Sequence, residues 1–153
     1  MIKSAVISKC GLYRYELRRI WQPEVGLVCW TMLNSSTADA NFDDPTVRRC
    51  MDYTARWGYG GIIVVNEFAL RATDPKNLHE CTDPVGPKND EHIMKANAEA
   101  RLTIVAWGTQ GKYLRRDEHV MMIVTFPHYL TLTKDGSPGH PLRLLKGLDP
   151  VPY

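Results

Sequence analysis

The stretch Leu27-Val28-Cys29-Trp30-Thr31-Met32-Leu33 is almost wholly apolar and runs directly into residues 34–39, which are polar except for Ala38. An apolar run of this kind is typical of a strand that is buried on both faces, as in a parallel sheet. The same change from a β-like run to a polar motif follows residues 62–65, 102–107 and 129–133. Four such strands, separated by helical patterns, predict a three-layer αβα domain with a four-stranded, mainly parallel core sheet.

The segments around these runs complete the predicted layout of the domain. Residues 13–21 alternate in polarity, which predicts an added N-terminal edge strand. Asp44 and Pro45 are typical of the N-cap and first position of a helix, and Gly58 of its end. Further helices are expected over 89–101 and 112–124, a long loop over 69–89, and a short helical turn over 141–145. All of these belong to one predicted domain over residues 1–153.

Composition narrows the class of protein without identifying a partner. The chain has 153 residues, of which 44% are hydrophobic, enough for one core. A formal net charge of +2 falls well short of a strongly basic footprint. The four cysteines show no C-x-x-C spacing and the chain has no P-loop or dinucleotide fingerprint, so we expect no metal and no cofactor. The sequence has no signal-like start and no run of ~18 apolar residues, which predicts a cytoplasmic protein without a membrane contact. Its oligomeric state is left open.

Three polar residues follow predicted strands and form the candidate site. They are Asn34, Asn66 and His140. Ligands bind at the carboxyl ends of strands in open α/β sheets, so these side chains are expected to meet in one crevice. Each also has an ordinary structural interpretation. Asn34 could form an Asx-turn or a helix cap, Asn66 could be satisfied by nearby backbone, and His140 could be a solvated loop residue.

The longer motifs resemble those of a bacterial and phage family, domain of unknown function 1643. The shared stretches are residues 32–39, 43–50, 65–75, 83–90 and 140–142, so the resemblance is nearly full length. One departure is Ser35, which stands where the family pattern leads us to expect proline after the asparagine. This resemblance implies little about activity.

The order of the motifs is also similar to that of the uracil-DNA glycosylase superfamily, over about residues 27–145. In that superfamily the first strand ends in a turn that positions water, and the second ends in an asparagine that reads the base. The third strand ends near a glycine, and a motif beginning His-Pro follows the last. The corresponding residues here are Asn34, Asn66, Gly108 and His140. The resemblance therefore implies a uracil-DNA-glycosylase-like fold.

The same resemblance implies a role for each residue of the site. Asn34 and His140 would be catalytic, Asn34 by holding the attacking water and His140 by stabilising the charge of the departing base. Asn66 would bind the edge of a uracil-like or modified base, and Phe42 is the candidate to stack on it. The residues expected to contact phosphates or support the loops are Ser36, Thr37, Asp39, Arg71, Ser137 and Arg143.

The implied function is recognition of such a base, with hydrolysis of its N-glycosidic bond as the leading reaction. The expected partner is a nucleobase-containing ligand, with DNA as its leading form. Two alternatives stay open: a non-catalytic nucleotide-binding or nucleic-acid-binding protein, such as a phage-type decoy or sensor, and an enzyme for another N-glycosidic reaction on a modified base. A set of two asparagines and one histidine contains no nucleophile and no metal geometry, so it does not choose among them.

Overall fold

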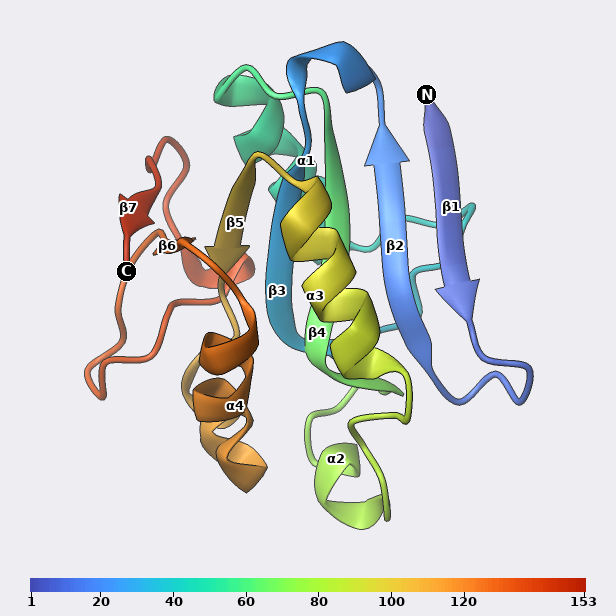
Figure 1. The fold of residues 1–153 in the computed structure, drawn as a ribbon. Coiled ribbons are helices and arrows are strands. Elements are labelled where there is room, and N and C mark those ends of the chain that lie inside the picture. Colours follow the sequence, from blue (N-terminus) through green and yellow to red (C-terminus); the bar gives the residue numbers. More distant parts are fainter.

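The computed structural model describes all residues from Met1 to Tyr153 and places every strand in one sheet (Figure 1). The strand order is β1-β2-β4-β3-β5-β6-β7. The strands are β1 (Ile2–Ile7), β2 (Arg14–Ile20), β3 (Val28–Ser35), β4 (Gly61–Arg71), β5 (Leu102–Val105), β6 (Pro127–Tyr129) and β7 (Val151–Pro152).

The sheet is mixed, and this corrects the predicted architecture. The pairs β1–β2, β2–β4 and β6–β7 are antiparallel, whereas β3–β4, β3–β5 and β5–β6 are parallel. The prediction of a four-stranded, mainly parallel sheet of the glycosylase type with one N-terminal edge strand is therefore wrong. β2, which contains most of the predicted edge strand, lies inside the sheet between β1 and β4. β1 and β7 escaped prediction because β1 has no buried residue and β7 has only two residues.

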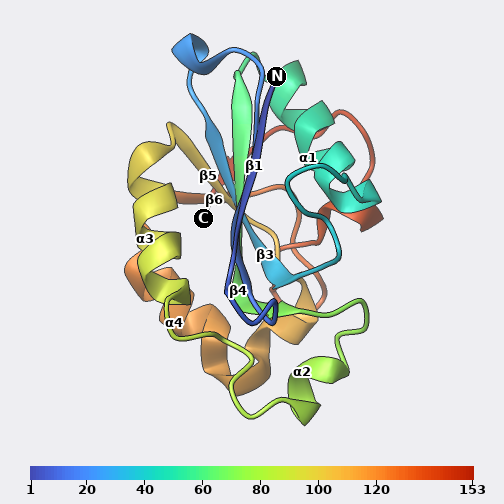
Figure 2. The same cartoon turned by 90° about the vertical axis from the view of Figure 1, so that its right-hand side faces the viewer.

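Helices cover both faces of this sheet. Figure 2 shows the sheet edge-on, with α1 (Pro45–Arg56) on one side and α3 (Asn89–Glu99) and α4 (Arg116–Ile123) on the other. α1 begins as its sequence predicts, because the Asp44 side chain accepts a hydrogen bond from the Val47 backbone N–H at 2.8 Å and Pro45 takes the first helical position. The remaining short pieces are α2 (Asn77–Glu80), η1 (Pro23–Val25), η2 (Thr109–Arg115) and η3 (Pro141–Arg143).

The two central strands divide their side chains between two cores. Cys29, Ile63 and Val65 pack on the α3 and α4 side, whereas Trp30 and Val64 pack on the α1 side. This alternation is the two-residue period of a strand, and all five residues are 0% exposed. Burial on both faces explains why the apolar runs in β3 and β4 were visible in the sequence.

β2 is harder to read in the sequence because it buries charged residues. Arg14, Glu16 and Arg19 are all buried in this seven-residue strand. Arg19 is fully buried, and its Nε donates to the Asp43 carboxylate at 2.6 Å. The partner lies 24 residues away in sequence, so the interaction that permits the burial is tertiary.

Several boundaries move in ways that matter for the site. β4 runs on to Arg71, so Asn66 lies within the strand instead of after it. The predicted helix over 112–124 divides into η2 and α4, separated by left-handed backbone at Leu114 and Arg115. The predicted strand over 129–133 is reduced to β6 and a single bridge from Leu132 to Pro138. No helix has the length and apolar character needed to cross a bilayer.

Candidate functional site

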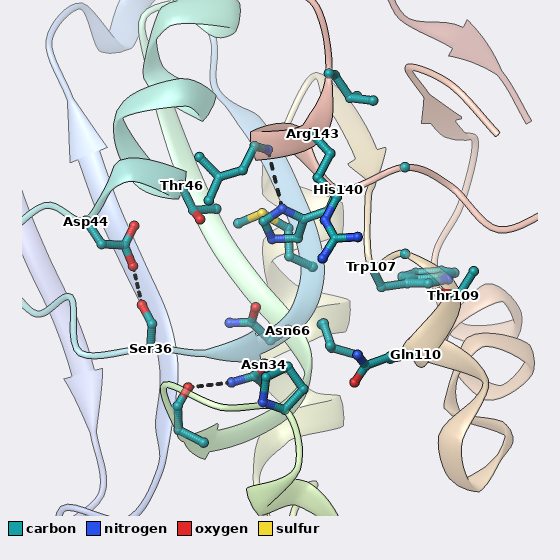
Figure 3. Close-up of a pocket in the computed structure, with 18 of the residues that line it drawn as sticks. Asn34, Ser36, Asp44, Thr46, Asn66, Trp107, Thr109, Gln110, His140 and Arg143 are labelled. Carbon is teal, nitrogen blue, oxygen red and sulfur yellow. Dashed lines mark hydrogen bonds between the residues drawn. The ribbon is translucent and has the colours of Figure 1, made fainter. Parts of the chain in front are cut away.

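A pocket of about 580 Å³ opens beside the ends of β3 and β5, and Asn34, Asn66 and His140 all line it. This volume falls in the usual range for small-molecule sites. Figure 3 shows the three side chains facing the same cavity, with Trp107 and Gln110 opposite. The tertiary fold therefore brings together residues that are up to 106 positions apart in the chain (140 minus 34).

Asn66 supplies a buried free amide to the pocket. It lies in β4 opposite Met32 of β3 and is only 2% exposed. Its side chain makes no hydrogen bond with the protein, and Nδ2 is shielded from solvent. An unsatisfied buried amide costs roughly 1–3 kcal/mol, so the fold leaves a costly unpaired polar group at the wall of this pocket.

The backbone that carries Asn66 is firmly fixed. Asn89 Nδ2 donates to the carbonyl oxygens of Asn66 and Glu67, at 2.8 and 3.0 Å. Arg116 Nε donates to the same Glu67 carbonyl at 3.0 Å. These donors come from α3 and α4, so the helices on the far face of the sheet hold the position of the pocket's amide.

Asn34 is partly committed to the backbone. Its Nδ2 donates to the carbonyl oxygens of Ser35 and Ala72, at 2.9 and 2.8 Å, which ties the end of β3 to the segment after β4. The ordinary interpretation of Asn34 as a chain-turning residue therefore has a direct structural basis. Because both amide hydrogens are used, only Oδ1 remains, and it can accept a hydrogen bond from water or from a ligand.

His140 is held in one tautomer by its own turn. It caps η3, and its Nδ1 accepts a hydrogen bond from the Leu142 backbone N–H at 3.3 Å (Figure 3). Burial lowers the pKa of His140, the nearby Arg143 charge lowers it further, and Asp44 opposes them, so the ring is neutral at pH 7. A neutral ring that accepts at Nδ1 carries its proton on Nε2, which is left as a donor.

Trp107 is a site residue that the strand-end argument missed. It is 2% exposed and lines the pocket just after β5. Gly111 packs so closely against its ring that a Cβ there would lie 2.2 Å from Trp107 Cδ1. The signal available in the sequence was the large aromatic next to Gly108, which was interpreted only as the end of a strand.

The remaining predicted residues are divided between the pocket and its surroundings. Ser36 and Arg143 line the pocket, and the Ser36 hydroxyl donates to the Asp44 carboxylate. The predicted residues that do not line it are Phe42, Thr37, Asp39, Arg71 and Ser137. Phe42 is 54% exposed, whereas the Asp39 carboxylate accepts the backbone N–H groups of Asn41 and Phe42 and so shapes the loop.

Two buried ionisable residues near the pocket were also missed. Arg14 is 2% exposed and lines the pocket. Glu67 is fully buried on the opposite face of β4, and neither carboxyl oxygen has a hydrogen-bond partner. Burial raises the pKa of Glu67 to about 10, with Asp117 adding to the effect and Arg116 opposing it. Glu67 is therefore an uncharged acid at pH 7, packed against Gly111.

The fold and the pocket define a class of protein. It is an α/β protein with a mixed sheet and a polar pocket that contains a free amide, a neutral histidine and an indole. A family model described as protein of unknown function (DUF1643) matches residues 14–142. The chain belongs to this family, and the match includes Asn34, Asn66 and His140. No curated protein and no solved structure matches the chain.

Proposed function

We propose that the pocket recognises a uracil-like or modified nucleobase, carried by a nucleotide or by DNA. The observation that carries this proposal is the unpartnered, 2% exposed side chain of Asn66 at the pocket. A carboxamide presents one N–H donor and one C=O acceptor side by side, which complements the amide edge of a pyrimidine such as uracil.

The other lining groups suit a planar, polar ligand. Trp107 offers an aromatic surface for the base, a role that Phe42 cannot fill from its position outside the pocket. The Nε2–H of His140 is available to a carbonyl oxygen on the base. Arg14 and Arg143 add positive charge to the lining, which favours a ligand that carries phosphate.

Hydrolysis of the N-glycosidic bond is the leading reaction. The bond between the base and the sugar would break with its electron pair leaving on the base, and a water oxygen would bond to the anomeric carbon. One proton of that water would then be released, and the departing base would take up a proton. His140 would stabilise the developing negative charge through Nε2–H, and Asn34 Oδ1 would orient the water.

Binding without cleavage is the second candidate, and one observation favours it. Asp44 is the only carboxylate among the residues that line the pocket. Its two oxygens already accept hydrogen bonds from the Val47 N–H and the Ser36 hydroxyl. Since no uncommitted carboxylate is present to take a proton from water, a slow enzyme or a pure nucleotide-binding protein is consistent with this lining.

The test combines binding and cleavage on matched ligands. Deoxyuridine and thymidine are titrated by calorimetry, and oligonucleotides with one uracil or one thymine are incubated and then treated with alkali. Asn66→Asp should weaken deoxyuridine binding about tenfold, because a carboxylate cannot donate to the base. Asn41→Asp, which places the same charge on an exposed residue outside the pocket, is the matched control and should have no effect.

The outcomes separate the two candidates. Cleavage would be established if the wild type forms alkali-labile product and His140→Ala forms less of it while binding the ligand as well as before. This pattern is expected because the developing anion is stabilised mainly in the transition state. Binding that depends on Asn66, with no product formed, would establish that the protein binds the nucleotide without cleaving it. If deoxyuridine does not bind, or binds equally to the wild type and to Asn66→Asp, the proposal is refuted.

A further inference from the structure

Three arginines are buried in this protein, and one of them lacks an acidic partner. Arg19 donates through Nε to the Asp43 carboxylate at 2.6 Å, and Arg116 donates through Nη2 to the Asp90 carboxylate at 2.8 Å. Arg14 is 2% exposed and forms no ion pair. The fold thus supplies a counter-charge for two of the three buried guanidinium groups.

The contacts of Arg14 leave most of its donors unused. Nη1 donates to the Ala38 carbonyl at 2.9 Å, which is its one hydrogen bond. Nε is shielded from solvent and has no partner. Burial lowers the pKa of Arg14 to about 10, and the neighbouring charges of Arg71 and Arg19 lower it while those of Asp44 and Asp39 raise it. The group remains a cation at pH 7, and an unpaired buried cation is costly unless a ligand provides the anion.

A second group of donors lies at the same pocket. α1 has twelve residues, and its first turn carries Thr46, which also lines the pocket. In this turn Pro45 has no N–H and the Val47 N–H is capped by Asp44, which leaves the Thr46 N–H and hydroxyl without a partner. The N-terminus of a helix favours anions through such free N–H groups and through the helix dipole. Arg143 is the second cationic side chain of the lining, after Arg14.

One carboxylate opposes an anion here. Asp44 lines the same pocket, but the Val47 N–H and the Ser36 hydroxyl donate to its two oxygens. Replacing Asp44 by Asn would keep a good helix cap while removing the negative charge. The site thus offers a variant that should strengthen anion binding as well as variants that should weaken it.

We propose that Arg14, with the first turn of α1 and Arg143, forms a phosphoryl subsite of this pocket, so that the ligand is a phosphorylated nucleotide unit and not a free base. This proposal rests on the proposed function for the base end of the ligand. A guanidinium fork matches the oxygens of a phosphoryl group. The phosphoryl group can belong to a free nucleotide or to the backbone of DNA.

The test measures phosphate and base separately. Inorganic phosphate, deoxyuridine, dUMP and an oligonucleotide with one internal uracil are titrated into the protein by calorimetry at low salt. dUMP should bind about tenfold more tightly than deoxyuridine, as expected for one charge-assisted contact. Arg14→Gln should remove this gain without changing deoxyuridine binding, Arg14→Lys should keep part of it, and Asp44→Asn should increase it.

Arg48→Gln is the matched control, because Arg48 is an exposed residue on the first turn of α1 that does not line the pocket. Equal losses in Arg14→Gln and Arg48→Gln would overturn the subsite. If Arg14→Gln does not fold, Asp44→Asn decides the matter, and an unchanged or weaker dUMP affinity in that variant overturns it.

Failure of the two proposals can be distinguished. Deoxyuridine binding with no added affinity for dUMP overturns the subsite and leaves the proposed function intact. Arg14-dependent binding of inorganic phosphate without deoxyuridine binding supports the subsite and refutes the proposed function. If Arg14→Gln weakens the binding of dUMP alone, the phosphoryl group comes from a free nucleotide. If Arg14→Gln also weakens the binding of the oligonucleotide, the phosphoryl group comes from the DNA backbone.

Discussion

Glu67 should make the protein less stable as pH rises through neutrality, and Glu67→Gln should remove this dependence. The side chain is fully buried and neither carboxyl oxygen has a partner. Burial raises its pKa to about 10 in the folded protein, whereas an unfolded glutamate titrates near ~4.3. Between these values the folded state holds a proton that the unfolded state has released, so stability is greatest at low pH and is lost as pH rises toward the folded pKa.

The magnitude follows from proton linkage. One extra proton bound by the folded state changes the free energy of unfolding by about 1.4 kcal/mol per pH unit. Between about pH 6.5 and about pH 8 the contribution of Glu67 should therefore fall by about 2 kcal/mol. The buried thiols of Cys29 and Cys50, whose pKa values are raised by burial, act in the same direction at higher pH, but they are common to the wild type and the variant and cancel in the difference.

The assay is urea denaturation at both pH values for the wild type, Glu67→Gln and Glu91→Gln. Glu91 is an exposed glutamate of α3 without a hydrogen bond or ion pair through its side chain, so its variant should keep the wild-type pH dependence. Between the two pH values the free energy of unfolding of Glu67→Gln should fall by about 2 kcal/mol less than that of the wild type and of Glu91→Gln. Parallel pH dependence in all three proteins would refute the conclusion that Glu67 is buried as a neutral acid.

Three further changes test other parts of the structure. Asp43→Ala should lower the free energy of unfolding by about 3 kcal/mol in urea denaturation, because it strands the fully buried Arg19 guanidinium; a loss no larger than that of an exposed pair would contradict this. Thr54→Val should cost about 1–2 kcal/mol in the same assay, since the buried Trp30 Nε1–H donates to the Thr54 hydroxyl at 3.0 Å, and an unchanged midpoint would exclude that bond. Ligand affinity should be constant from pH 8 to 7 and fall as His140 is protonated below its lowered pKa, because the imidazolium can no longer accept the Leu142 N–H; a profile that His140→Gln leaves unchanged would assign the effect elsewhere.

Some of the site was visible in the sequence because its signals are local. Asp44 and Pro45 mark the start of α1 by the chemistry of the first turn, which depends on neighbouring residues alone. The apolar runs of β3 and β4 reflect burial on both faces of each strand. Polar residues that interrupt or follow such runs, such as Asn34 and Asn66, were therefore natural candidates for the pocket.

Other features have no local signal. The extent of the sheet was missed because β1 has no buried residue and β7 has only two residues, too few to show a period. Phe42 looked suitable as a stacking aromatic by its place in the chain, but the loop around Asp39 leaves it exposed outside the pocket, and Trp107 is the aromatic that lines it. Spacing along a chain does not determine on which side of a loop a side chain lies.

The sequence by itself determined the helix start at Asp44 and the two buried central strands, because helix capping and continuous apolar runs depend on neighbouring residues alone. Only the tertiary structure decided which polar groups stay unsatisfied. Arg14 and Arg19 lie in the same strand, yet only Arg19 forms an ion pair with a carboxylate. Asn66 has a free side-chain amide, whereas the amide of Asn34 donates both hydrogens to backbone carbonyls. The physical reason is that burial and partnership are set by contacts between residues distant in the chain, and the free energy of a buried polar group depends on those contacts.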